Sequence, residues 1–119
     1  MTANNETGVI QDLNKLIAEC HARGIHFHTD AVQALGKLDF SFRKLNLDMA
    51  SLSSHKIYGP KGCGALVVKN NTLIKALQSG GNQEHALRAG TENVAAIVGF
   101  GKAAEIAKQS MQQVQAQLI

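Results

Sequence analysis

Four polar runs in the sequence bring together residue types that can do chemistry. The run HTDAVQ, residues 28–33, ends a strand-like segment in a carboxylate, with an amide three residues later. The run SSHKIYGPKG, residues 53–62, places hydroxyl, imidazole and amine groups in a turn rich in glycine. NNETG, residues 4–8, and RAGT, residues 88–91, are further polar loops. An amine, a carboxylate and several donors are what a reactive anionic cofactor needs.

Lys56 has the clearest potential for covalent chemistry. A free lysine has a pKa of about 10.4 and is a poor nucleophile at neutral pH, but burial or imine formation removes its charge. A cofactor that carries an aldehyde would make Lys56 a Schiff-base residue. Pyridoxal phosphate is such a cofactor, and it also needs an acid for its ring nitrogen and donors for its phosphate. Asp30 can be that acid, Gln33 can donate to the ring phenolate, and Ser53 and His55 can bind the phosphate.

Taken together, the four runs resemble the motifs of cysteine desulfurases, which are pyridoxal-phosphate enzymes related to class V aminotransferases. They occur in the family's order and at nearly its spacing, and the resemblance extends from about residue 3 to residue 108. The run at residues 53–62 is the most specific of the four. The resemblance implies that the parent enzyme converts L-cysteine to L-alanine and an enzyme persulfide, whose sulfur enters iron–sulfur clusters or thiolated tRNA.

The resemblance also implies a role for each matching residue of the two central runs. Lys56 becomes the catalytic Schiff-base lysine, which also moves the α-proton of the substrate. Asp30 becomes the partner of the pyridine nitrogen and Gln33 the partner of the phenolate oxygen. Ser53 and His55 correspond to phosphate ligands.

Two positions in the outer runs extend the implied site. Asn5 corresponds to a residue near the cofactor and the substrate carboxylate. Thr91 matches a residue that reaches the phosphate bound by a neighbouring subunit, which implies a homodimer. Sulfur-acceptor proteins are further partners that the resemblance allows.

The two cysteines depart from the family pattern. Cys63 lies in the glycine turn seven residues after Lys56, and Cys20 lies on an apolar helix face, so neither matches the persulfide-forming cysteine. In the family that cysteine, and the arginine that binds the substrate carboxylate, follow the region matched here, and a ring-stacking segment precedes it. We therefore expect residues 1–119 to be part of a cofactor-binding large domain, truncated at both ends and without turnover by itself.

The elements that would position these groups alternate between helices and short strands, which predicts an α/β fold. The resemblance refines this to part of the fold type I large domain, with a mostly parallel sheet flanked by helices. Apolar spacing predicts that Leu13, Leu16, Ile17 and Cys20 share one helix face. The expected elements are a helix at 13–23, a strand at 25–29, a short helix at 40–47, strands at 49–53 and 64–69, a helix or strand at 72–77, and a long helix from 93 with a core-facing apolar stripe.

Length and composition exclude several classes of protein. A chain of 119 residues suits one domain. No apolar run approaches the roughly 20 residues that span a bilayer, and the first residues lack a signal-peptide pattern. The net charge of +3 is dispersed and aromatic residues are few, which argues against direct nucleic-acid binding. Two cysteines are too few for a disulfide scaffold, and they indicate reduced thiols in a cytoplasmic protein.

Three alternatives stay open at this point. His26, His28 and Asp30 alternate along a strand and would share a face, so they form a candidate metal site, although no further ligand cluster completes it. The chain is also compatible with a non-catalytic binding partner of a full-length desulfurase. Within the enzyme class, a selenocysteine lyase-like or other class V activity competes with cysteine desulfuration.

Overall fold

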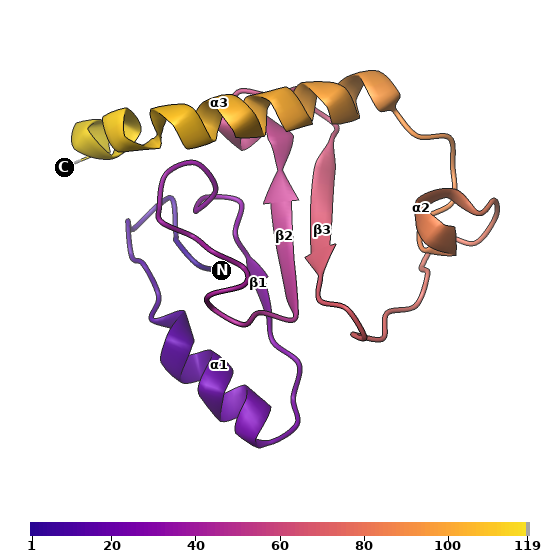
Figure 1. Ribbon diagram of the computed structural model, residues 1–119, viewed down its shortest axis with the longest axis horizontal. Helices are drawn as coiled ribbons and strands as arrows, with labels where there is room; N and C mark the ends of the chain where they lie inside the picture. The colour runs from indigo at the N-terminus through magenta and orange to yellow at the C-terminus, as the bar shows by residue number, and fades with distance from the viewer. Residues whose placement is uncertain (119) are drawn as a thin grey trace.

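The computed structural model describes residues 1–118, which form a three-stranded sheet with helices around it (Figure 1). Helix α3 runs across one end of the sheet, and α1 lies beside β1 at the other end (Figure 1). In chain order the elements are α1 (Leu13–Ala22), β1 (His28–Asp30), β2 (Met49–Ser53), the 3-10 helix η1 (Ser54–Ile57), β3 (Gly64–Val68), α2 (Gln83–Ala86) and α3 (Val94–Leu118).

The sheet has the order β1-β2-β3 and is mixed. β1 and β2 are parallel, with Asp30 opposite Ser51, whereas β3 pairs antiparallel with β2. The α/β prediction is thus confirmed, but the part of the sheet within residues 1–118 is not mostly parallel. The antiparallel pair arises because only residues 54–63 separate β2 from β3, which is too short for a crossover connection.

The core lies between α1, the sheet and the segment after β1. Its buried members are Leu13, Ile17, Ala31, Ala34, Leu47 and Ala50. The predicted helix face is only partly confirmed, since Leu16 remains 47% exposed. At the opposite end of the sheet, Thr2 donates its backbone N–H to the carbonyl of Asp30 at 2.8 Å, which fastens the first residues beside the end of β1.

Three predicted segments differ from the structure. Residues 40–47 form turns instead of a helix: the Leu45 N–H donates to the Ser41 carbonyl at 3.0 Å as in a helix, but Asn46 adopts a left-handed φ of 55°, so the turn does not extend further. Residues 72–77 form neither a helix nor a strand, and Leu73 and Leu77 are exposed without core contacts that would stabilise either. β1 begins at His28, three residues later than predicted, and the Phe27 N–H donates to the Asp48 side chain at 2.8 Å instead of to a strand.

Helix α3 is present as predicted, but its predicted apolar stripe faces the core only in part. Val94, Ile97, Val98 and Ile106 are exposed, Met111 and Val114 are half-buried, and the fully buried positions are Ala96 and Ala103. The reason is that α3 contacts η1 through small residues, which let the two backbones approach closely. Within residues 1–118, no helix is both long and apolar enough to span a bilayer.

Candidate functional site

The carboxyl ends of β1 and β2 meet at one edge of the sheet, below α3 (Figure 1). Asp30 is the last residue of β1, and Ser53, two residues beyond the partner of Asp30, is the last residue of β2. The carboxyl edge of parallel strands is where α/β sheets bind their ligands. Topology therefore brings two of the predicted site residues to a common edge.

The 3-10 helix η1 presents Lys56 at this edge. A 3-10 helix has three residues per turn, so Ser54 and Ile57 share a face, and both are buried. His55 and Lys56 lie between them and are exposed. η1 ends where Tyr58 adopts a left-handed φ of 65°, which turns the chain back towards β3. The burial of two neighbours thus holds the Lys56 amine outward.

The turn after η1 explains why glycine follows Tyr58. A Cβ at Gly59 would overlap with the buried Ser54 hydroxyl and would lie 3.0 Å from the Cβ of Ala103 on α3. The Gly59 N–H donates to the Ser54 carbonyl at 3.0 Å, and the Ser54 N–H donates to the carbonyl of Cys63 at 3.1 Å. The turn is therefore packed under α3, and this packing fixes η1 and its lysine.

Ser53 and His55 form a polar pair at the start of η1. The Ser53 hydroxyl and Nδ1 of His55 are 2.9 Å apart, a hydrogen-bond distance. Ser53 is half-buried and His55 is exposed, so the pair is accessible from solvent. A hydroxyl and an imidazole side by side can both donate to the oxygens of a phosphate.

Asp30 uses one of its oxygens locally. Oδ1 accepts the Val32 N–H at 2.9 Å, which holds the half-buried carboxylate in place as the chain leaves β1. The Ala31 N–H continues the ladder to the carbonyl of Ser51 at 3.0 Å. Within residues 1–118, Oδ2 of Asp30 makes no hydrogen bond, so it is free to meet a protonated ring nitrogen.

Gln33 is linked to Lys56 through a residue that the sequence did not single out. Nζ of Lys37 donates to Oε1 of Gln33 at 2.9 Å and to the backbone carbonyl of Lys56 at 3.4 Å. The pKa of Lys37 is lowered, first by burial and second by the positive charge of Lys56. The spacing of four residues between Gln33 and Lys37 is the only feature of the sequence that could have indicated the contact between these two side chains.

Asn5 lies in a turn that is fastened to the end of β1. The Thr2 and Thr29 hydroxyls are 2.9 Å apart and buried, and Asn4 Oδ1 accepts the N–H groups of Glu6 and Thr7. Nδ2 of Asn5 donates to the carboxylate of Glu6 at 2.7 Å. The turn is tied to the end of β1 through Thr2, but within residues 1–118 no side-chain hydrogen bond joins Asn5 to another predicted site residue.

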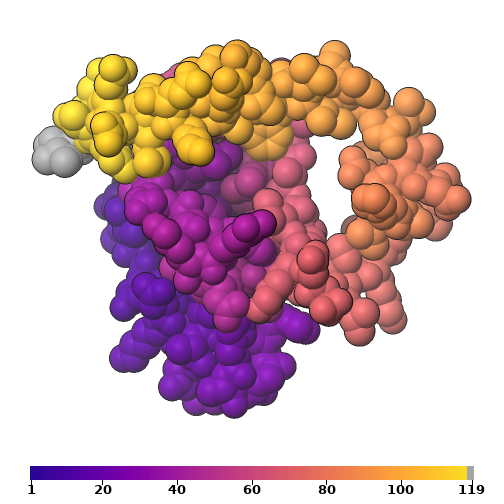
Figure 2. Space-filling view, in the orientation of Figure 1, coloured from indigo at the N-terminus to yellow at the C-terminus, as the bar shows by residue number. Residues whose placement is uncertain are grey.

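Thr91 stands apart from the other predicted residues. It is exposed and belongs to the segment between α2 and α3, which bows away from the sheet beyond β3 (Figure 2). Within residues 1–118 it makes no side-chain hydrogen bond to the sheet edge. Its predicted role, reaching a neighbouring subunit, stays a prediction.

The three residues of the alternative metal site face different partners. Nδ1 of His26 lies 3.5 Å from Oδ1 of Asp48, and Nε2 of His28 lies 2.7 Å from the Ser51 hydroxyl. Among the side chains of the described residues, no group of three His, Cys, Asp or Glu is placed to hold a metal ion. Cys20 and Cys63 are both free thiols and half-buried.

Comparison with known proteins agrees with this geometry. A model of the aminotransferase class-V family matches residues 1–118, and the chain belongs to that family. A cysteine desulfurase of Enterobacter agglomerans is 53% identical over 111 residues, which cover 93% of this chain and 28% of that protein. The cysteine desulfurase IscS of Clostridium botulinum is 50% identical over 111 residues, with the same coverage of both chains.

Solved structures give the same result. A NifS-like protein superimposes with a TM-score of 0.89 at 43% identity, over 95% of this chain and 32% of that one. A NifS-like protein from Rickettsia africae gives a TM-score of 0.90 at 39% identity, over 94% of this chain and 31% of that one. The expected fold class, that of fold type I pyridoxal-phosphate enzymes, is confirmed. The chain spans less than a third of the length of these relatives.

Proposed function

We propose that this chain is the part of a pyridoxal-phosphate-dependent cysteine desulfurase that holds the cofactor. The parent reaction converts L-cysteine to L-alanine and leaves the sulfur on an enzyme cysteine as a persulfide. One observation carries the proposal: η1, which contains the exposed Lys56, directly follows Ser53 at the edge of the sheet where β1 ends in Asp30 and β2 ends in Ser53. The names of the relatives, cysteine desulfurases, support it.

The donor set at this edge fits pyridoxal phosphate. Its aldehyde requires an accessible amine, which Lys56 offers. Its phosphate requires donors, and the Ser53–His55 pair supplies them. Its ring nitrogen requires a carboxylate, and Asp30 has a free oxygen within the described residues. Gln33 has an amide for the phenolate oxygen.

The bound cofactor supplies an electron sink that stabilises negative charge at the substrate α-carbon. The Asp30 carboxylate keeps a proton on the ring nitrogen, because an anion beside that nitrogen favours its charged form. The Lys56 amine, once free, takes the proton from the substrate α-carbon and returns it. Asn5, in the turn beside β1, is assigned to the substrate carboxylate and the cofactor.

The remaining assignments concern the parent enzyme. We propose that it acts as a homodimer in which Thr91 reaches the phosphate bound by the neighbouring subunit. Delivery of sulfur for iron–sulfur clusters or thiolated tRNA, through acceptor proteins in the cytoplasm, belongs to the same proposal. The membership of the chain in the class V family supports these assignments.

The cofactor proposal is tested by reductive trapping. The purified chain is incubated with pyridoxal phosphate, reduced with borohydride and weighed by intact mass spectrometry beside Lys56→Ala. We expect a single adduct in the wild-type chain that is lost in Lys56→Ala and kept in Lys15→Ala, a change at an exposed lysine of α1. An adduct of equal yield in Lys56→Ala would overturn the proposal.

A further inference from the structure

Lys37 bridges two residues of the proposed site. Its Nζ donates to the side-chain carbonyl of Gln33 at 2.9 Å and to the backbone carbonyl of Lys56 at 3.4 Å. Lys37 and Lys56 also line the same hollow of about 130 Å³ between η1 and α3. A third contact fixes the backbone of Lys37, because Nε2 of Gln115 on α3 donates to its carbonyl at 3.0 Å.

The chemistry of the ammonium group decides which way the Gln33 amide points. A lysine ammonium has three donors and no acceptor, so it meets the oxygen of an amide and not the nitrogen. With Oε1 held by Lys37, the NH₂ group of Gln33 must point away from Lys37. An isolated glutamine has no such preference, because both amide orientations are open to it. Lys37 therefore leaves the NH₂ group of Gln33 as the donor that is available to a ligand.

The environment of Lys37 differs from that of a solvent-exposed surface lysine. It is half-buried, and burial together with the nearby charge of Lys56 lowers its pKa. A buried charge is costly unless it is hydrogen-bonded, and here both acceptors belong to the proposed site. The two hydrogen bonds offset part of the cost of burying the charge, and they fix two residues of the proposed site at once.

We propose that Lys37 is a positioning residue that orients the Gln33 amide as a hydrogen-bond donor to the anionic ring oxygen of the cofactor. The inference rests on the proposed function for the identity of the acceptor. It does not rest on it for the orientation of Gln33. Lys37 touches neither substrate nor cofactor in this assignment and acts through Gln33.

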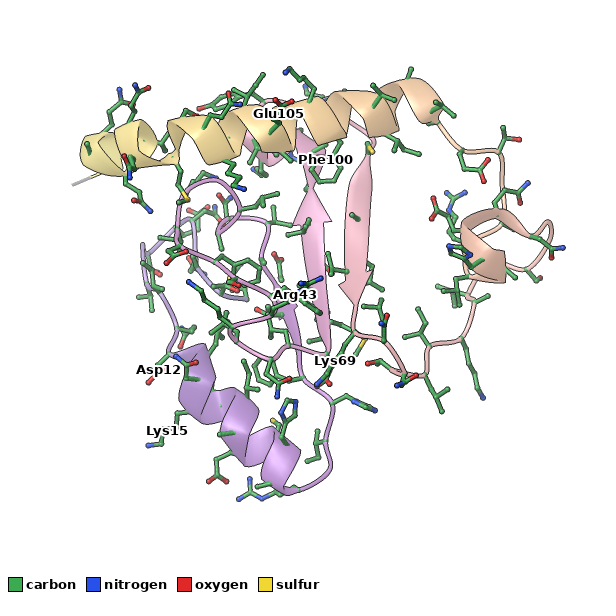
Figure 3. All side chains as sticks on the ribbon, viewed as in Figure 1. Asp12, Lys15, Arg43, Lys69, Phe100 and Glu105 are labelled. Carbon is green, nitrogen blue, oxygen red and sulfur yellow. The ribbon has the colours of Figure 1, made fainter. Side chains whose placement is uncertain are left out.

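The orientation is tested first without any cofactor. Nuclear magnetic resonance of the Gln33 side-chain NH₂ group reports its mobility on the chain alone. We expect Lys37→Met, which keeps the apolar stem, to increase that mobility, and Lys37→Arg to retain the wild-type value. Lys15→Met is the matched control, since Lys15 projects from α1 away from the sheet (Figure 3). Unchanged Gln33 mobility in Lys37→Met would overturn the inference.

The second test uses the chain loaded with pyridoxal phosphate and follows the pH midpoint of the cofactor's visible absorbance. A donor to the anionic oxygen favours its charged form, so losing that donor raises the midpoint, by about half a unit to one unit. We expect this rise in both Gln33→Ala and Lys37→Met, and no rise in Lys37→Arg. If Lys37→Met does not fold, Lys37→Ala replaces it.

A double variant separates positioning from a direct effect of the Lys37 charge. If Lys37 acts through Gln33, adding Lys37→Met to Gln33→Ala leaves the midpoint where Gln33→Ala put it. A further rise in the double variant would show that the Lys37 charge acts directly and would overturn the positioning role. Failure of the wild-type chain to load at Lys56 would instead overturn the proposed function. Loading with an unchanged Lys37→Met midpoint would overturn the inference alone.

Discussion

Asp48 shows how one residue can fasten several segments of this small protein. The carboxylate is only 5% exposed, and it accepts the Phe27 N–H at 2.8 Å. Nε2 of His21 lies 2.8 Å from Oδ2, and Nδ1 of His26 lies 3.5 Å from Oδ1. Burial raises the pKa of Asp48, but these hydrogen bonds and the His21 charge outweigh burial, and the net pKa is lowered.

The lowered pKa of Asp48 has a defined consequence for stability. A carboxylate with a depressed folded pKa stabilises the fold above its unfolded pKa, and this stabilisation is lost as the pH falls through the folded value. We expect Asp48→Asn to lower the free energy of unfolding by about 1–3 kcal/mol at pH 7, and by less below pH 3. Urea denaturation at both pH values measures this. The exposed Asp39→Asn is the control, and equal losses at both pH values would contradict the assignment.

Ser54 is a buried hydroxyl that does not contribute a hydrogen bond. Its Oγ is fully buried and has no partner among the described residues. An unsatisfied polar atom costs its desolvation, so removing it is not penalised. We expect Ser54→Ala to keep or raise the free energy of unfolding, by up to about 1 kcal/mol. Thermal or urea denaturation decides this, and a loss above that size would show that the hydroxyl has a partner.

Among the elements, the packing of α3 against η1 determines where Lys56 lies. Gly36 sits at this contact with a φ of +73°, and a Cβ there would lie 2.9 Å from the Cβ of Ala107 and 3.2 Å from Cγ2 of Ile57. Gly62 has a similar φ of +75°, but a Cβ there would meet nothing within 4 Å. Alanine substitutions at Gly36 and Gly62 therefore separate the energetic cost of backbone strain from the cost of steric crowding.

We expect Gly62→Ala to cost about 1 kcal/mol of unfolding free energy, from the left-handed backbone alone. Gly36→Ala adds overpacking against α3 and η1, which brings its cost to about 2–4 kcal/mol. Chemical denaturation of the two variants measures the difference. Equal costs would mean that α3 is not seated on η1 as described.

The sequence predicts an element well when residues within that element determine its structure, and poorly when contacts with distant residues do. β2, β3 and α3 were predicted because their residue patterns are distinctive by themselves. The predicted helix at 40–47 was wrong, because the chain makes only a short turn there, which the left-handed Asn46 ends. The predicted buried face of α3 was partly wrong, because the helix packs through alanines. A sequence pattern predicts the buried face from large apolar residues instead.

The same distinction applies to the site. The sequence singles out Asp30, Ser53, His55 and Lys56 as candidates because they lie in compact polar runs, and the structure places these runs at the ends of adjacent strands; their roles stay predictions. Lys37 was missed, because its importance comes from a contact across nineteen residues to the Lys56 carbonyl. No spacing in the sequence predicts the contact between Lys37 and the Lys56 carbonyl, which only the fold brings about.

At the scale of the whole molecule, the proposed function makes the chain the cofactor-holding part of a larger enzyme. Its proposed site residues would bind and orient the cofactor, and the resemblance assigns the persulfide-forming cysteine to a region that neither Cys20 nor Cys63 matches. We expect the loaded chain to release no alanine from L-cysteine. Amino-acid analysis after incubation tests this, with a full-length family member as positive control. Alanine release that is lost in Cys63→Ala would show that Cys63 serves as the nucleophile.

The position of the trapped cofactor shows directly whether Lys56 is the Schiff-base lysine. After borohydride reduction, the chain is digested and its peptides are sequenced by mass spectrometry to locate the pyridoxyl group. Two other lysines serve as internal controls. Lys37 lines the same hollow as Lys56, and Lys61 follows Lys56 closely in the sequence. We expect the label on Lys56, with Lys37 and Lys61 unmodified. A label on Lys37, or one spread evenly over the lysines, would contradict it.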